Sequence, residues 1–470
     1  MSTVTSAPAR RKRKVVARGS GLPPSLQAVH LNAAGIDVGS AEHYVAVPED
    51  RDPQPVRRFE CFTADLEHLA DWLEACRIDT VVMESTGVYW IPLFQILDSR
   101  GFDVKLVNAR HVKNVPGRKT DVHDCQWLQQ LHTFGLLAGS FRPDDQTCVL
   151  RSYIRQRDTL IRDSAAHIQR MQKALTQMNV QLHKVISDIT GATGLRIIRA
   201  ILDGQRDPQR LVALKDPRIR SSREQIAKAL HGDYRPEHLF ALRQSLALYD
   251  TYRQMIADCD RQIDQCLAGF ETQCDPAEQP LGPPKQVHRK PRGNEAHFDL
   301  RSHLYRIAGV DFTEVDGFDA LTVQTLLSEV GLDPSRFPSA KHFASWVALC
   351  PDNRITGGAI KSSKTRKVVS RVATALRRAA QSAANSHTAL GAFHRRMRAR
   401  LGPAAAITAT AHKLARLFYH LWKYRDTYHD PGFDYYETKH RERTLNSLRK
   451  RAATLGFQLV QLQPVTADVS

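Results

Sequence analysis

Four acidic residues occupy positions that a fold could bring together. Asp37 ends one apolar, strand-like stretch and Glu84 ends another, while Asp121 and Asp124 are three residues apart on a predicted helix and so share one of its faces. Carboxylates that converge from two strand ends and one helical turn suit a pair of hard cations, Mg²⁺ above all and Mn²⁺ as a substitute, for phosphoryl transfer. Taken singly, each acid also fits an ordinary role: a turn cap, a surface residue, or a helix N-terminal acid. Taken together, they predict a metal site.

The C-terminal half contains a long stretch without acids. No Asp or Glu occurs from Asn353 to Arg425, whereas 16 Lys or Arg residues lie between Arg354 and Arg425. Such a continuous positive field binds polyphosphate by releasing counterions, although a short run of this kind would be read as a solvated helix face. A second basic run, at 10–14, lies in a tail that has no acid before Asp37. The residues that we expect to hold a nucleic-acid backbone are Lys361, Lys364, Arg366, Lys367, Arg371 and Arg378.

Length and composition limit the class of protein. The 470 residues carry a formal net charge of +18, and a 42% hydrophobic share is sufficient for buried cores. No apolar run approaches the ~20 residues of a membrane span, and no signal-like apolar core follows the N-terminal charges. The eight cysteines include no C-x-x-C pair, so we expect reduced thiols rather than zinc or disulfides. We expect a cytoplasmic protein without a membrane partner.

The elements that must position the acids lie at 32–145. Three short strands in a meander, over 33–48 and 56–62, precede an alternation of helices with strands at 80–85 and 103–108, and a helix begins near Asp121. This order is typical of an RNase H-like α/β domain, in which the ends of the first and fourth strands lie side by side. The fold class is therefore predicted to be α/β plus α.

The rest of the chain is predicted to be mainly helical. Apolar residues spaced three and four apart predict two long helices that pair as an antiparallel coiled coil around an insertion at roughly 187–240. One seam is expected to contain Ile161, Ala165 and Ile168. A helix from about 365 to 386 should turn Val368 and Val372 inward, after a polar loop at 351–364. The expected divisions are a basic tail at 1–31, the α/β domain at 32–145, the coiled coil at 146–270, a linker at 271–300, a C-terminal domain at 301–430 and a tail at 431–470.

Four strings in this order resemble one family: GIDVGS at 35–40, MESTGVYW at 83–90, KTDVHDCQWL at 119–128 and SRFPSAKHFASWVALCPDNRITGG at 335–358. They are similar to the insertion-sequence one-ten family of DEDD transposases, which are bridge-RNA-guided DNA recombinases. The resemblance implies a RuvC-like N-terminal domain whose metal-binding acids are Asp37, Glu84, Asp121 and Asp124. It also implies a coiled coil and a C-terminal transposase domain with a hydroxyl nucleophile.

The same resemblance implies a bacterial, nucleoid-associated location and the partners. Donor and target DNA are the expected substrates, a structured noncoding RNA is the expected guide, and the expected assembly is a dimer or tetramer in which the acids of one protomer meet the hydroxyl of another. The chain departs from the family pattern at the nucleophile, where Thr356 replaces the serine before glycine. The threonine methyl group crowds in-line attack, so Ser362 or Ser363 remain alternatives.

The preferred interpretation is thus a transposase that cuts and rejoins DNA by Mg-dependent phosphoryl transfer, with Thr356 as the attacking hydroxyl. Two alternatives stay open. A RuvC-like junction resolvase or nuclease would use the same acids with water as nucleophile, and a catalytically dead derivative would only bind nucleic acid.

Overall fold

The computed structural model describes residues 27–108, 121–285 and 294–460, and of Asp121 only the backbone. The predicted basic run at 10–14 lies outside the described residues. The chain divides into two compact units, Met1–Arg142 and Pro143–Ser470, which are described separately below.

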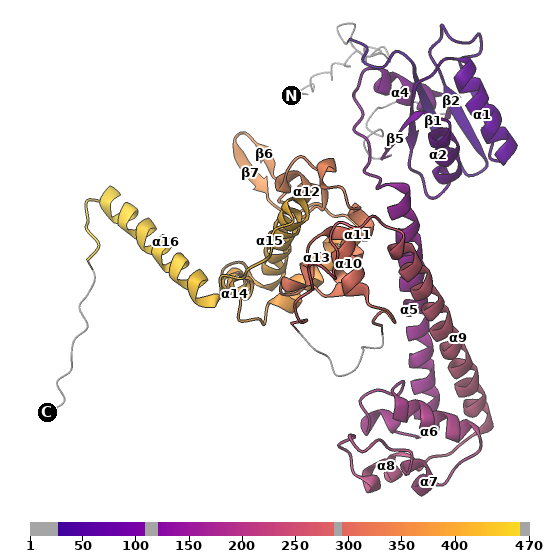
Figure 1. The fold of residues 1–470 in the computed structure, drawn as a ribbon, viewed down its shortest axis with the longest axis vertical. Helices are drawn as coiled ribbons and strands as arrows, with labels where there is room; N and C mark the ends of the chain where they lie inside the picture. Colours follow the sequence, from indigo (N-terminus) through magenta and orange to yellow (C-terminus); the bar gives the residue numbers. More distant parts are fainter. Residues whose placement is uncertain (1–26, 109–120, 286–293, 461–470) are drawn as a thin grey trace, which may run out of the picture. The chain divides into compact units, whose positions relative to one another are not determined.

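The first unit is built on a five-stranded sheet in the order β3-β2-β1-β4-β5 (Figure 1). Its strands are β1 (Ala33–Val38), β2 (Glu42–Ala46), β3 (Val56–Glu60), β4 (Thr80–Glu84) and β5 (Asp103–Val107). The first three form an antiparallel meander, and β1, β4 and β5 run parallel. The sequence-predicted strands, and the adjacency of the first and fourth, are confirmed; the RNase H-like assignment stays a prediction.

Helices cover both faces of this sheet. Alternate strand residues such as Ile36 and Met83 pack with α1 (Thr63–Ala75) and α2 (Trp90–Ser99) in the main core. The residues between them face α4 (Asp121–Thr133), whose Leu128 packs against Val82. The sheet is buried on both sides because two sets of apolar residues alternate along its central strands.

The second unit begins with two long helices, α5 (Asp145–Gln177) and α9 (Pro236–Ala268), which pack along each other (Figure 1). They run antiparallel, since Gln146 near the start of α5 donates to the carbonyl of Gly269 after α9, at 3.0 Å, and the rings of His167 and Tyr252 lie 5.4 Å apart. The expected antiparallel pairing is confirmed, whereas coiled-coil geometry stays a prediction.

The predicted seam on α5 is wrong by one position over part of its length. Ala165 is exposed and Ile161 and Ile168 are only half-buried, while Ser164 and His167 are buried in their place. The reason is a buried ion pair between the helices, in which Nε of Arg157 donates to Oδ1 of Asp260 at 2.5 Å. Satisfying that pair sets the rotation of the helix, and apolar spacing alone does not reveal it.

Short helices fill the predicted insertion between α5 and α9. We call residues 182–235 the tip subdomain; it contains η1 (Leu182–Lys184), α6 (Ala192–Leu202), α7 (Pro208–Val212) and α8 (Arg223–Ala229). Its core, which includes Ile197, Ile198 and Leu230, is continuous with Met178 and Leu242 on the two long helices.

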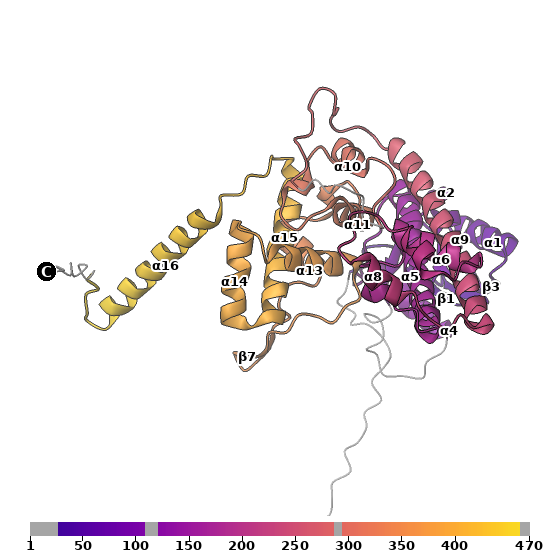
Figure 2. The same ribbon diagram turned by 90° about the horizontal axis from the view of Figure 1, so that it is seen from below.

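The remainder of the second unit is a helical domain. Its helices are α10 (Leu300–Ala308), η2 (Phe312–Glu314), α11 (Ala320–Val330), η3 (Pro334–Arg336), α12 (Ala340–Trp346), α13 (Arg371–Ala383), α14 (Ala389–Leu401), α15 (Pro403–Tyr424) and α16 (Phe433–Thr454). Helices α12, α13 and α14 pack on α15, and Figure 2 shows α13 and α14 beside it. Phe418 and Trp422 of α15 join Phe343 in an aromatic core. Gly309, at φ 71°, ends α10.

Three sequence predictions need correction in this domain. Helix α13 begins at Arg371, because the side chain of Ser370 caps it, so Val368 precedes the helix and is 45% exposed. The predicted polar loop contains a two-stranded hairpin, β6 (Arg354–Thr356) and β7 (Ala359–Ser362). The segment predicted as a C-terminal tail forms the 22-residue helix α16.

Among the described residues, no helix is both long enough and apolar enough to cross a bilayer.

Candidate functional site

Asp37 and Glu84 lie side by side at the carboxyl ends of β1 and β4. The two parallel strands are in register with Ile36 opposite Met83, and each acid is the next residue of its strand. Glu84 shares the parity of Val82, and Asp37 that of Gly35, so both acids belong to the face covered by α4. The sheet register thus brings these two acids together, as the sequence predicted.

Gly35 allows α4 to lie directly on β1. A Cβ atom at this position would come within 2.3 Å of the backbone N of Gln129 and 2.4 Å of the carbonyl O of Cys125. Real Cβ contacts are longer, so a glycine is required for helix and strand to approach this closely. The close approach fixes the level of α4 relative to Asp37, two residues further along β1.

Helix α4 runs antiparallel to β1 and β4. Its last turn lies at the start of β4, where Nε2 of His132 and Oγ1 of Thr80 are 2.9 Å apart in a buried hydrogen bond. Its middle lies over Gly35, so its first turn, with Asp121 and Asp124, lies toward the carboxyl ends of the two strands. The fold therefore places Asp37, Glu84 and the first turn of α4 toward the same end of the sheet. We call this region, with the four sequence-predicted acids, the acidic edge.

The buried thiol of Cys125 lies near two of the acids at this edge. Its thiol is fully buried and donates to the carbonyl of Val122 at 3.1 Å. Burial raises the pKa of this thiol to about 12, and the nearby carboxylates of Asp37 and Asp124 contribute to the same shift. The two acids thus lie within electrostatic range of one buried atom, while Cys125 itself stays protonated.

The donor chemistry of the acidic edge fits a hard cation. Carboxylate oxygens are the ligands of Mg²⁺ and Mn²⁺, and the one soft ligand nearby, Cys125, is a protonated thiol directed at its own helix. Among the residues whose side chains the structure describes, which exclude Asp121, no group of three or more His, Cys, Asp or Glu is close enough to hold an ion. Joint ligation by the four acids therefore stays a prediction.

Thr356 lies at the tip of the β6–β7 hairpin in the second unit. It pairs with Ala359 across a two-residue turn made by Gly357 and Gly358, whose φ angles are 56° and 77°. Left-handed angles at both positions are those of a tight hairpin turn, which glycine adopts without strain. Thr356 is exposed, and Cβ atoms added at either glycine would touch nothing within 4 Å. The structure thus presents the hydroxyl on an open turn.

The alternative nucleophiles differ in their surroundings. Ser362 ends β7, is half-buried, and its hydroxyl accepts a bond of 3.4 Å from the backbone N of Lys364. Ser363 is exposed beyond the strand. Neither adjoins the two-glycine turn, so Thr356 is the hydroxyl next to the tip of the hairpin.

The predicted phosphate-binding residues fall into two groups. Lys361, Lys364, Lys367 and Arg378 are exposed, and none forms an ion pair within the described part of the chain. Arg366 donates to the backbone O of Ser345 in α12, which ties the base of the hairpin to the helical domain.

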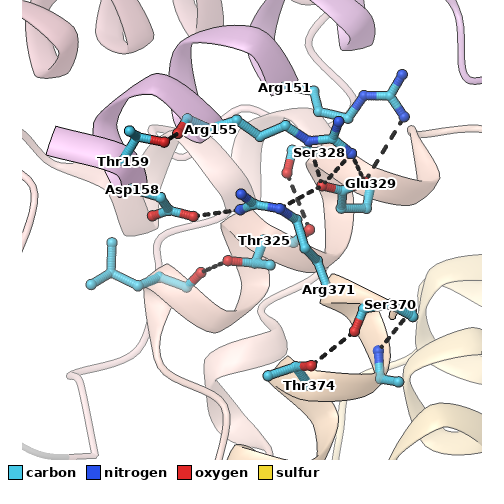
Figure 3. Close-up of polar contacts among 12 residues, drawn as sticks. Arg151, Arg155, Asp158, Thr159, Thr325, Ser328, Glu329, Ser370, Arg371 and Thr374 are labelled. Carbon is cyan, nitrogen blue, oxygen red and sulfur yellow. Dashed lines mark hydrogen bonds and ion pairs between the residues drawn. The ribbon is translucent and has the colours of Figure 1, made fainter. Parts of the chain in front are cut away.

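Arg371 belongs to an ion-pair network that sequence reasoning missed (Figure 3). Its guanidinium lies 2.6 Å from Asp158 of α5 and 3.8 Å from Glu329 of α11. Glu329, whose side chain is only 11% exposed, also accepts a bidentate contact from Arg155, at 2.7 and 3.0 Å. This network joins α5, α11 and the start of α13, the helix that follows the hairpin. Acids far away in the sequence supply it, so spacing carries no signal of it; a role of Arg371 in binding nucleic acid stays a prediction.

Comparisons with known proteins add two matches. A family model for transposases of the DEDD type, named for IS110, matches residues 34–180, which include the acidic edge. A second, described as the transposase IS116/IS110/IS902 family, matches residues 311–398, which include the hairpin. The comparison with curated proteins gave no match.

Proposed function

Because the chain belongs to the IS110 family of DEDD transposases, an enzyme family that acts on DNA, we propose that it breaks and rejoins DNA strands through a hydroxyl nucleophile aided by the acidic edge. The observation that carries this proposal is the convergence of Asp37, Glu84 and the first turn of α4 at the carboxyl ends of two neighbouring strands.

The acidic edge is proposed to bind the divalent cation. Asp37, Glu84, Asp121 and Asp124 would hold Mg²⁺, or Mn²⁺, which when bound neutralises phosphate charge and stabilises the entering and leaving oxygens. The support for this proposal is the all-carboxylate donor set and its position at one sheet edge.

Thr356 is proposed to attack phosphorus. Its oxygen forms a bond to the phosphorus of the scissile phosphodiester while the bond from phosphorus to one deoxyribose oxygen breaks. The threonine proton passes to solvent or a neighbouring base, and the leaving oxygen takes up a proton to become a DNA hydroxyl. A hydroxyl of the second DNA end then attacks the threonine phosphodiester and releases Thr356, so strands are rejoined without hydrolysis.

The exposed hairpin supports this role because an open turn can enter a DNA-bound site. The hydroxyl must reach the acidic edge of its own chain or of another copy. We propose the second arrangement, in a dimer or tetramer, and a structured RNA encoded by the element as the guide to donor and target DNA. The family resemblance supports both of these proposals.

Hydroxyl chemistry is tested in a plasmid recombination assay with the element's RNA. Thr356→Ser should recombine at least as well as the parent because it removes a crowding methyl group, and Thr356→Ala should be inactive while DNA binding is retained. Matched variants, Ser362→Ala and Ser363→Ala, should remain active. Full activity of Thr356→Ala would contradict the proposal.

A water-dependent nuclease is the second candidate, because the same acidic edge could serve water as the nucleophile where the threonine methyl group crowds attack. It predicts hydrolysed DNA ends, and their appearance in Thr356→Ala at parental rates would support it. A catalytically dead derivative predicts that Asp37→Asn changes no measurable activity.

A further inference from the structure

Helix α16 is divided into a docked half and a free half. In the docked half, Glu437 and His440 contact Arg396 of α14, and the ammonium of Lys413 from α15 lies 5.4 Å from the ring centre of Tyr436. The ring of Tyr436 also meets that of Phe393 edge-on at 6.4 Å. These contacts attach the first turns of α16 to the helical domain.

The free half carries positive charge without neutralisation. Arg443, Arg449, Lys450 and Arg451 are exposed, and no Asp or Glu follows Glu442 before Asp468. Within the described part of the chain none of the four forms an ion pair, and α16 has no fully buried residue. Cations in the last turn gain from the helix dipole, but Arg443 lies outside it, so the dipole does not account for all four.

The end of α14 extends the same surface. Arg400 is exposed in the last turn of α14. The positive charges of Arg400 and Arg443 both lie within electrostatic range of Tyr436, where with Arg396 they oppose the rise that burial causes in the pKa of that phenol. We call Arg400, Arg443, Arg449, Lys450 and Arg451 the α14/α16 cationic surface.

The tip subdomain offers a contrast within the same chain. Four of its eight arginines have an acidic neighbour within 4 Å: Arg199 with Asp250, Arg210 with Asp207, Arg218 with Asp216 and Arg235 with Glu237. On the α14/α16 cationic surface like charges repel one another instead. A bound polyanion neutralises these charges, so relief of their repulsion contributes to the free energy of binding.

We propose that the α14/α16 cationic surface binds the phosphate backbone of duplex DNA. Duplex DNA is the polyanion on which the proposed enzyme acts, and its closely spaced phosphates offer several contacts to the unpaired Arg and Lys side chains on α16. Helix α16 lies outside both matched segments, 34–180 and 311–398, so this contact is additional to the regions that the family models cover. It contributes affinity and salt dependence, and leaves target choice to other parts of the complex.

The test measures DNA affinity apart from chemistry. Full-length protein with Asp37→Asn is the background, and Arg443, Arg449, Lys450 and Arg451 are all changed to Gln, which preserves helix propensity. The matched control changes Arg199, Arg210, Arg218 and Arg235 to Gln, so the net charge of the two proteins is equal. Fluorescence anisotropy with a short duplex, between about 50 and 200 mM salt, gives Kd and its salt slope.

The α16 variant should bind the duplex at least about tenfold more weakly than the parent, and its slope of log affinity against log salt concentration should be smaller in magnitude by about 2 to 3. The control should bind within about twofold of the parent and keep the parental slope. Replacing Arg443, Arg449 and Arg451 by Lys should keep most of the affinity, because phosphate is held by charge. Equal losses in the two Gln variants, or an unchanged slope in the α16 variant, would overturn the proposal.

The same variants distinguish duplex DNA from two other binding partners of α16, an RNA and a second copy of the chain. If α16 holds RNA instead, the α16 variant will lose affinity for a structured RNA hairpin but keep its affinity for the duplex. If α16 pairs with a second copy through Leu445 and Leu448, Leu448→Glu will change the mass in sedimentation while the Gln variant leaves duplex binding intact. Either result would overturn the assignment to duplex DNA. Failure of Thr356→Ala to lose activity would leave this proposal standing, since binding is measured without turnover.

Discussion

The acidic edge and the Thr356 hairpin are positioned by very different amounts of structure. Under the acids lie a buried sheet, a helix held against Gly35 at backbone contact, and a buried hydrogen bond at the far end of that helix. The hairpin has its own ladder, the contact of Arg366 with Ser345 and a bridge between Pro351 and Thr365. The fold therefore prepares the acidic edge before any ligand binds. Under the proposed mechanism, the Thr356 hydroxyl would acquire its final geometry on docking with DNA and the acids.

Removing an acid should have the largest effect on activity. Asp37→Asn retains the shape of the side chain but loses its charge, so we expect recombination to fall by about a thousandfold or more, since electrostatic stabilisation of phosphoryl transfer is lost. Binding of duplex DNA should persist. The control is Asp98→Asn, an exposed acid on α2, which should recombine like the parent. Parental recombination by Asp37→Asn would remove the acidic edge from the mechanism.

Gly35→Ala tests how rigidly the edge is built. The new methyl group would lie 2.3 Å from the backbone of α4, which cannot move without dragging the first turn and its two acids. We expect the free energy of unfolding of this unit to fall by about 3 kcal/mol and activity to be lost. Gly139→Ala is the control, because its Cβ would find its nearest neighbour, the carbonyl of Leu106, at 4.0 Å. Chemical denaturation measures the free energy of unfolding of both variants. Equal values would show that α4 can move away from β1 at little cost.

The pH dependence of stability tests the buried imidazole of His132 in the last turn of α4. Burial lowers the pKa of this imidazole to about 4 from an ordinary 6.5, with the positive charges of Lys105 and His30 contributing. Between these two pH values the unfolded chain binds more protons, so the free energy of unfolding should rise from pH 4 to pH 6.5 and then level off. The gain is about 3 kcal/mol, at about 1.4 kcal/mol for each unit of the pKa difference.

The variant His132→Gln should flatten this part of the stability curve, and denaturation at pH 4.5 and pH 7.5 measures it. His30→Gln is the comparison, since His30 stacks on His132 at 4.8 Å but is less buried, and it should change the slope less. An unaltered slope in His132→Gln would mean that its imidazole is not held neutral.

Glu329→Gln should have the smallest effect on stability. Glu329 belongs to the ion-pair network at the start of α13, the helix that follows the hairpin. It removes the charge that Arg155 and Arg371 share, and we expect a loss of about 1 to 2 kcal/mol because Glu329 is largely buried but its partners are partly solvated. Asp258→Asn breaks an exposed pair with Arg261 and should cost less than about 0.5 kcal/mol. Similar values for the two variants would reduce the network around Arg371 to an ordinary surface contact.

The sequence predicted the acidic edge better than it predicted the hairpin. Strands ending in Asp37 and Glu84 follow from apolar runs and from the chirality of parallel connections, which are local and general rules. The close approach at Gly35 also had a signal, a glycine inside a strand two residues before an acid. The hairpin was predicted as a polar loop, although Gly357-Gly358 between Thr356 and Ala359 is a recognised turn sequence.

Other features depend on contacts that no local pattern contains. Arg157 pairs with Asp260 between α5 and α9, where Ser164 and His167 replace the predicted apolar residues, and Asp158 and Glu329 engage Arg371 across more than 40 residues of sequence. Charged partners so far apart are found only when the helices are placed. Helix α16 was missed because its apolar residues are few and none is buried, so hydrophobic periodicity was weak.

The most direct test of the central claim is to trap the covalent intermediate. Wild-type protein, the element's RNA, Mg²⁺ and a nicked DNA substrate are quenched in denaturant, digested with protease and analysed by mass spectrometry. The account predicts a DNA-linked peptide whose modified residue is Thr356, a serine linkage at the same position in Thr356→Ser, and no linkage in Asp37→Asn or Thr356→Ala. Cleaved DNA with free ends and no attached peptide would contradict it.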